Sequence, residues 1–203
     1  LYPGAKFGFG PAIEEGFYYD IDFPTPITEE DLPAIEKEMH KIAAKNEKFV
    51  REEVSKEEAK KLFKDNPYKL ELIEGIEGQI TIYRQGEWFD LCAGEHVEST
   101  GKIQNFKLTT IAGAYWRGDS KNKQLVRIYG TSWPSRKELE DYLRMVEERK
   151  ARDHRKLGKE LGLFMLSEFG PGLPFWLPNG MILRTELENM WKEVHRKYDY
   201  LFV

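Results

Sequence analysis

Asp90, Cys92 and His96 lie within the short stretch DLCAGEH and bring together a carboxylate, a thiol and an imidazole. A thiol and an imidazole both bind zinc, but a zinc site needs three or four protein ligands. The same groups can instead perform acid–base chemistry, with Asp90 orienting His96 or a water molecule. A lone C-x-x-x-H pair also occurs in loops that have no function. The pattern therefore leaves a metal site, a catalytic site and an incidental loop open.

Few other residues of the chain could complete such a site. Cys92 is the only cysteine, and His40, His154 and His195 each lie in a stretch with a helical pattern. His40 falls one residue off the apolar stripe of its helix, so we expect it to face solvent. A single cysteine cannot form an internal disulfide, which favours a reducing, cytosolic compartment.

The elements around DLCAGEH decide whether its polar groups can meet. Residues 78–96 contain two β-rich runs separated by a glycine turn, which predicts a hairpin that ends in this stretch. On a strand, Asp90 and Cys92 project from the same face. Gly94 permits a tight turn that could bring His96 back toward them.

The rest of the chain predicts an α+β fold with an antiparallel sheet. Up to residue 133 we expect a strand at 16–23, a helix capped by Thr28 at 28–49, a helix at 56–66 opened by a Ser55/Glu58 capping box, and strands at 105–120 and 123–133. After residue 133 we expect one helix from Ser135 to about Leu161, an amphipathic helix at 181–198 and a strand that starts at Asp199.

Composition narrows the class of protein. The chain has 203 residues, 40% hydrophobic and 33% charged, as in an ordinary globular protein. No apolar run approaches the roughly 20 residues that cross a bilayer. The net charge of −4 argues against general coating of nucleic acid. The basic run at 149–159 is either a solvated helix face or a strip that contacts phosphates.

Five stretches, taken together and in order, resemble threonyl-tRNA synthetases of the bacterial type. The resemblance covers essentially the whole chain. The stretches are GPAIEEGFYYDIDF, FDLCAGEHV, TTIAGAYWRGDSKNKQLVRIYGTSW, RDHRKLGKELGLF and FWLPNGMILRTELENMW. The third also looks like the additional domain that threonyl- and alanyl-tRNA synthetases share.

The resemblance implies a modular enzyme segment. Residues 1–133 are similar to the antiparallel-sheet editing domain, without its N-terminal helix, which hydrolyses seryl-tRNA made in error. Residues 134–161 look like the long linker helix that runs beside the acceptor arm of the tRNA. Residues 162–203 resemble the beginning of the class II aminoacylation domain, including the motif 1 helix.

The resemblance also implies an editing site. The family combines H-x-x-x-H with C-x-x-x-H, and Cys92 and His96 match the second half. Asp90, Lys69 and the pocket residue Tyr19 match further positions of that site. The first half is expected on a helix just upstream of the point where this sequence begins.

Roles for these residues follow as hypotheses. His96 orients or deprotonates the attacking water, and Asp90 positions the water or His96. Lys69 offers positive charge to the oxyanion or to RNA, and Cys92 lines the pocket. Such a second site is needed because the one methyl group by which serine and threonine differ supplies only about 1–3 kcal/mol of binding discrimination.

Cofactors and partners also follow from the resemblance. The editing site is expected to need no metal, although a zinc variant that uses Cys92 and His96 stays open. The parent enzyme implies ATP, magnesium and a catalytic zinc bound outside this chain, and a homodimer formed through the class II domain. We expect tRNA-Thr as the partner, contacted by Arg152, Arg155 and Lys156, with neither membrane nor DNA, and a cytoplasmic location.

Two other interpretations stay open. The segment could be a catalytically inactive module for RNA binding or subunit association. It could also be a freestanding aminoacyl-tRNA deacylase, which the class II segment at its C-terminal end disfavours.

Overall fold

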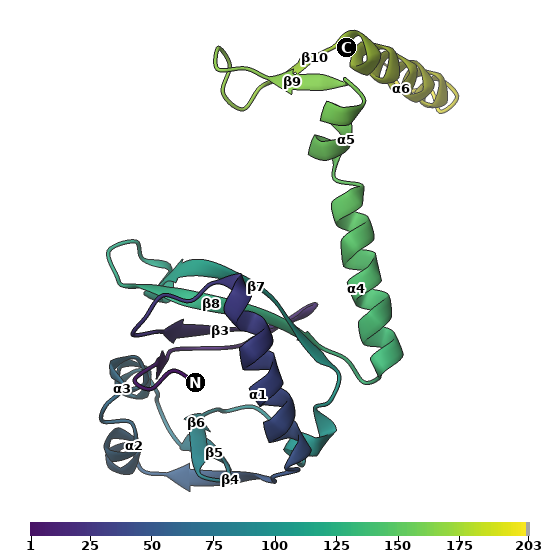
Figure 1. Cartoon of the computed structure of the whole chain (residues 1–203). Helices are drawn as coiled ribbons and strands as arrows, with labels where there is room; N and C mark the ends of the chain where they lie inside the picture. Colours follow the sequence, from purple (N-terminus) through teal and green to yellow (C-terminus); the bar gives the residue numbers. More distant parts are fainter. Residues whose placement is uncertain (202–203) are drawn as a thin grey trace. The chain divides into compact units, whose positions relative to one another are not determined.

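Two structural units make up the chain in the computed structural model, which describes residues 1–201. The first unit comprises residues 1–140, and the second begins at Asp141. Both contain helices and antiparallel strands (Figure 1), which confirms the α+β prediction. The division at residues 133 and 161 stays a prediction.

A five-stranded antiparallel sheet is the larger of the two sheets in the first unit. Its strand order is β1-β3-β8-β7, and β2 pairs with β3. The strands are β1 (Lys6–Phe7), β2 (Ala12–Ile13), β3 (Gly16–Asp22), β7 (Phe106–Tyr115) and β8 (Gln124–Ser132). The strands expected at 16–23 and 123–133 are therefore confirmed, and the one expected at 105–120 is present but ends at Tyr115, where a 3₁₀ turn, η3 (Trp116–Gly118), follows.

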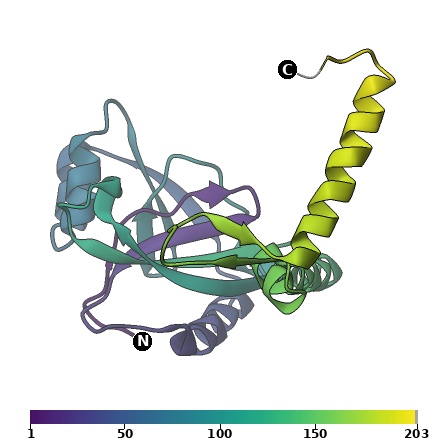
Figure 2. The same cartoon turned by 90° about the horizontal axis from the view of Figure 1, so that it is seen from above.

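Helix α1 (Leu32–Ala44) packs against this sheet (Figures 1 and 2). Leu32 is buried in one cluster with Ile21 of β3 and Ile128 of β8. The apolar stripe of α1 thus supplies the core of this part of the unit, as its three- and four-residue spacing predicts.

The helix expected at 28–49 is shorter than the sequence predicts. A 3₁₀ turn, η1 (Glu29–Asp31), precedes α1, and the Thr28 amide donates a hydrogen bond to the Asp31 carboxylate over 2.8 Å. The helix ends before Asn46, which adopts a left-handed φ of 52°. Asparagine tolerates this conformation, which terminates a helix. Phe49 belongs to the next strand.

A second, three-stranded sheet carries the DLCAGEH stretch. It consists of β4 (Phe49–Val54), β5 (Ile80–Gln85) and β6 (Trp88–Leu91), in the order β4-β5-β6. The expected hairpin is confirmed, and Gly86 at its turn has a φ of +56°, which suits glycine.

Two short helices cover one face of this second sheet. Helix α2 (Lys56–Leu62) begins at the expected Ser55/Glu58 capping box, and helix α3 (Pro67–Glu74) follows it. Their apolar residues form one core with two isoleucines of β5; its buried members are Ala59, Phe63, Ile73, Ile80 and Ile82. Asp90 of β6 and its cross-strand partner Tyr83 of β5 project from the opposite face of the sheet.

The second unit contains helix α5 (His154–Glu160), the antiparallel pair β9 (Phe164–Leu166) and β10 (Pro174–Trp176), and helix α6 (Pro178–Arg196). Helix α4 (Arg136–Ala151) leads into this unit and starts at the expected Ser135/Glu138 box. The single helix expected from Ser135 to Leu161 is wrong. The helix is interrupted at Asp153. The Asp153 carboxylate caps α5 by accepting a hydrogen bond from the Arg155 amide over 2.8 Å.

The amphipathic helix expected at 181–198 is confirmed by α6, but its apolar side is exposed. Leu187 is 54% exposed and Met190 is 58% exposed. The strand expected from Asp199 falls partly on residues 202 and 203, outside the described residues, and 199–201 are not in a strand. Within 1–201, the structure contains no helix long and apolar enough to span a membrane.

Candidate functional site

Lys69, Asp90 and Tyr19 form a buried polar cluster in the first unit. The Lys69 Nζ lies 2.6 Å from Asp90 Oδ1 and donates a hydrogen bond to the Tyr19 hydroxyl over 2.9 Å. The Tyr19 hydroxyl in turn donates to the second oxygen of Asp90. Lys69 is only 2% exposed and Asp90 only 8%. Each of the three residues comes from a different element, α3, β6 and β3.

The start of helix α3 places Lys69 in this cluster. Asn66 caps the helix, its side-chain oxygen accepting from the amides of Tyr68 and Lys69. The side-chain amide of Asn66 also donates to the Phe7 carbonyl of β1 over 2.8 Å. One asparagine therefore ties the first turn of α3 to the five-stranded sheet, and this fixes the stem of Lys69.

Burial and charge set the protonation states in the cluster. Burial lowers the pKa of Lys69, and the neighbouring Asp90 carboxylate opposes that shift. Burial, followed by the charge of Asp90, raises the pKa of Tyr19 far above its ordinary value. Tyr19 therefore keeps its proton at neutral pH and acts as a hydrogen-bond donor.

The Asp90 carboxylate is fully engaged. Its Oδ1 accepts from Lys69 and from the Leu91 amide at 2.8 Å, while its Oδ2 accepts from Tyr19. A carboxylate with both oxygens occupied in this way is held in one orientation and is a good positioning group. The geometry thus favours Asp90 as the residue that holds Lys69 in place.

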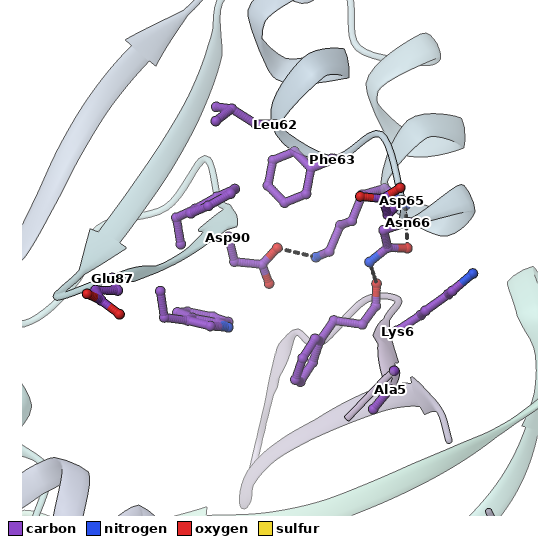
Figure 3. A pocket seen from close by; sticks show the side chains of 13 residues that line it. Ala5, Lys6, Leu62, Phe63, Asp65, Asn66, Glu87 and Asp90 are labelled. Atoms are coloured by element: carbon purple, nitrogen blue, oxygen red, sulfur yellow. Dashed lines mark hydrogen bonds and ion pairs between the residues drawn. The ribbon is translucent and has the colours of Figure 1, made fainter. Parts of the chain in front are cut away.

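A cavity of about 380 Å³ opens beside the ion pair, a size that suits a small ligand. Figure 3 shows the Asp90 carboxylate and the Asn66 amide directed into the same space, with Phe63 on its apolar side. Trp88 of β6 also lines the cavity. The cavity therefore combines apolar walls with a few fixed polar groups.

Cys92 lies just beyond the end of β6 at Leu91, two residues after Asp90, so the shared strand face of the two side chains stays a prediction. The Cys92 amide donates to the Thr81 carbonyl over 3.3 Å, and the Thr81 hydroxyl donates to the Cys92 carbonyl over 2.5 Å. The thiol is half-buried and free.

His96 does not contact this cluster directly. It is exposed, and its ring stacks on Tyr83 with 3.8 Å between ring centroids and 19° between planes. Phe49 flanks it at 5.3 Å and 51°. Tyr83 pairs with Asp90 across β5 and β6, so the imidazole lies on the same sheet face as the cluster, one side chain away.

The donor set does not fit a complete metal site. Among the described residues, no group of three or more His, Cys, Asp or Glu side chains could hold a metal ion. Cys92 and His96 are two of the at least three protein ligands that zinc requires. A zinc variant of this site would need further ligands from outside the described residues.

The three basic residues expected to contact RNA lie at the α4–α5 junction. Arg152 and Arg155 have side chains 70% and 77% exposed, and Lys156 is also exposed. The guanidinium of Arg155 lies 2.8 Å from Asp153, and that of Arg152 lies 3.6 Å from Glu148. Hydrogen bonds from Arg155 hold the pKa of Asp153 well below its usual range. Neighbouring carboxylates thus offset part of the positive charge of this stretch.

Sequence reasoning missed three residues that shape the site: Asn66, Tyr83 and Phe49. The pair Asn66-Pro67 is a helix-start signal, since asparagine caps helices and proline is favoured in the first turn. Tyr83 could have been found by pairing the two runs of the hairpin about their glycine turn. Phe49 could not, because it was assigned to the end of a helix.

Comparisons with known proteins point to one family. Residues 80–129 match the family described as the threonyl and alanyl tRNA synthetase second additional domain. The whole chain is 54% identical over 206 residues to a threonine–tRNA ligase of Rubrobacter xylanophilus, and 57% identical over 209 residues to one of Streptococcus gordonii. It spans about a third of the length of each, 32%. These matches confirm the resemblance along the entire chain.

Proposed function

We infer that the chain is a segment of a threonine–tRNA ligase, and that residues 1–133 are the editing part, which hydrolyses mischarged seryl-tRNA. The parent enzyme would ligate threonine to tRNA-Thr with ATP. The observation that carries this proposal is the buried Lys69–Asp90–Tyr19 cluster beside a cavity, in the unit that contains the additional-domain match.

The cluster suits stabilisation of an oxyanion. Hydrolysis of the ester at the tRNA 3′ end needs an oriented water, a proton acceptor and a donor for the developing negative charge. Lys69 supplies a fixed, nearly dry cation, and Asp90 holds it in place. A preorganised charge in such a site stabilises a transition state more strongly than a mobile one in water.

The remaining roles divide between three side chains. Tyr19, which keeps its proton, donates a hydrogen bond and closes the wall around Lys69. His96 orients or deprotonates the water from the exposed edge of the same sheet face. Cys92 is half-buried and is not among the residues that line the cavity beside Lys69 and Asp90, so its proposed role is contact with the substrate outside that cavity. No step of this scheme requires a metal ion held by these residues.

The second unit supports contact with tRNA and with a further protein surface. Exposed Arg152, Arg155 and Lys156 are proposed to contact RNA phosphates. The exposed apolar side of α6 is proposed to pack in the class II domain and at the homodimer contact of the parent enzyme. ATP, magnesium and the catalytic zinc are proposed to bind the parent enzyme outside this chain, in the cytoplasm.

A second candidate is a module that binds RNA or associates subunits without catalysis. It is favoured by the position of His96, which makes no direct contact with the Lys69–Asp90–Tyr19 cluster. Both candidates predict that tRNA binds. They differ in hydrolysis, which depends on the His96 imidazole only if the segment is catalytic.

Single-turnover deacylation of seryl-tRNA separates these candidates. It is measured on this chain and on a longer protein that carries the residues preceding Leu1. In the active form, His96→Ala should abolish hydrolysis. The matched control His40→Ala removes an exposed imidazole on α1, outside both the cluster and the basic stretch, and should leave the rate unchanged. If the longer protein binds tRNA but does not hydrolyse the ester, the inactive module is correct.

A further inference from the structure

We propose that Tyr83 is a positioning residue that holds the His96 imidazole in its working orientation. This inference rests on the proposed function, since it concerns the same hydrolytic site. The two rings lie 3.8 Å apart between centroids and only 19° from parallel. Such close, nearly parallel contact restricts both the position and the plane of an imidazole.

The loop that carries His96 is anchored at its two ends. At the start, the Cys92 amide donates to the Thr81 carbonyl over 3.3 Å; at the end, the Phe49 amide donates to the Glu98 carbonyl over 3.1 Å. Within residues 1–201, the intervening segment 93–97 makes no backbone-to-backbone hydrogen bond. The backbone alone therefore does not fix the direction in which the imidazole points.

Ring contacts supply that constraint. In the part of the chain that the structure describes, His96 makes no hydrogen bond or ion pair, and its contacts are with the rings of Tyr83 and Phe49. The Phe49 ring is farther away, at 5.3 Å, and inclined by 51°. Tyr83 is thus the principal support of the imidazole, and Phe49 limits its movement toward β4.

The place of Tyr83 in the sheet links this support to the charged cluster. Tyr83 is the cross-strand partner of Asp90, and partners in an antiparallel pair project from the same face about 5 Å apart. On the opposite face, Ile80 and Ile82 are packed against α2 and α3. Packing on that face holds strand β5 in place. Tyr83 therefore keeps a fixed position relative to the Asp90–Lys69 pair.

Tyr83 acts through its ring and not through its hydroxyl. A stacked ring leaves the edge of the imidazole, where both nitrogens lie, free to meet a water molecule or a substrate. Phenylalanine at this position would keep the stack, whereas leucine would remove the flat surface and keep an apolar side chain. The pair of variants Tyr83→Phe and Tyr83→Leu therefore separates positioning from simple packing.

The test is single-turnover hydrolysis of seryl-tRNA by the protein extended upstream of Leu1. Tyr83→Leu should lower the rate about 3- to 10-fold, the effect expected for losing one aromatic pair. Tyr83→Phe should retain the rate of the parent protein, and the affinity for tRNA should be unchanged in both. In the His96→Ala background, Tyr83→Leu should have no further effect, because the two residues act as one unit.

Proton NMR of the histidine rings gives a readout that is independent of hydrolysis. A stacked tyrosine shifts the His96 ring C–H signals upfield, and Tyr83→Leu should remove that shift. His40, which stacks on Phe106 at 4.2 Å and 22°, provides an internal control for correct folding and should keep its signals. The His96→Ala variant identifies the relevant peaks among four histidines.

The outcomes are distinct. If His96→Ala slows hydrolysis but Tyr83→Leu does not, the positioning role is overturned while the proposed function stands. The positioning role is also overturned if the rate decreases of His96→Ala and Tyr83→Leu multiply in the double variant. If His96→Ala leaves hydrolysis unchanged, both the role of His96 and the positioning role of Tyr83 are overturned.

Discussion

Replacing Asp90 by asparagine should destabilise the first unit strongly, because it leaves a cation buried without its counter-charge. Lys69 is 2% exposed, and its only carboxylate within ion-pair distance among the described residues is Asp90, 2.6 Å away. Breaking such a buried pair by removing one partner costs about 3–5 kcal/mol. That is a large fraction of the roughly 5–15 kcal/mol that stabilises an ordinary domain.

The pH dependence of stability gives the sharper form of this prediction. Burial already lowers the pKa of Lys69, and in Asp90→Asn the opposing carboxylate is gone, so the folded-state pKa falls further. The unfolded chain then binds more protons than the folded one between that lowered pKa and the ordinary value near 10.4. The free energy of unfolding of Asp90→Asn should therefore rise with pH across this window, relative to the parent protein.

Urea unfolding of the whole chain, followed by tryptophan fluorescence at several pH values, measures both effects. Asp65→Asn is the matched control, since Asp65 is an exposed carboxylate that lines the same cavity, and it should change stability by less than about 0.5 kcal/mol. Combining Asp90→Asn with Lys69→Met should recover part of the loss, because the second change removes the stranded cation. A loss below about 1 kcal/mol in Asp90→Asn, or a loss that does not diminish at high pH, would refute this reasoning.

Three further predictions concern other parts of the chain. Asn66→Ala should lower the free energy of unfolding by about 1 kcal/mol or more, measured by urea unfolding, because it removes the cap of α3 and the hydrogen bond to Phe7; unchanged stability would contradict the cap. Charge reversal at Arg155 and Lys156 should weaken tRNA binding and flatten its salt dependence by roughly one unit of slope per lost phosphate contact, measured by filter binding at several salt concentrations; equal slopes would make this stretch a solvated helix face. Ser55→Ala should cost about 1 kcal/mol by the same unfolding assay without altering hydrolysis, since its capping box lies outside the site.

Local patterns predicted part of the first unit, but neither helix α3, which carries Lys69, nor strand β4. The hairpin of β5 and β6, the capping box at Ser55 and the strands β7 and β8 all follow from alternation and turn residues. These signals are local, because each depends on residues that are neighbours in the sequence. The same patterns also placed Asp90 and Cys92 on one strand face.

The parts that could not be predicted depend on contacts distant in sequence. Tyr19 and Asp90 are 71 residues apart, and Lys69 meets Tyr19 across 50 residues. Only the family resemblance brought these three together before the structure did. The position of His96 illustrates the same limit, because the turn at Gly94 was expected to bring it to Asp90 and the structure places its ring on Tyr83.

The helix break at Asp153 has a local cause that the pattern obscured. The apolar spacing continues through the break into α5, so periodicity alone predicts one helix. Aspartate competes as a cap for the next helix, and here its carboxylate accepts from the Arg155 amide and pairs with its guanidinium. A residue that favours the N-cap position, inside an apparently continuous helix, was the sequence signal that could have predicted this break.

The most direct test of the proposed editing role compares hydrolysis of two esters by one protein. Seryl-tRNA and threonyl-tRNA are each incubated, under single-turnover conditions, with the protein extended upstream of Leu1. We predict that seryl-tRNA is hydrolysed at least about tenfold faster, the smallest discrimination expected from one methyl group in a fitted pocket, and that His96→Ala removes this difference. Equal rates for the two esters, or selective hydrolysis that survives His96→Ala, would contradict the account.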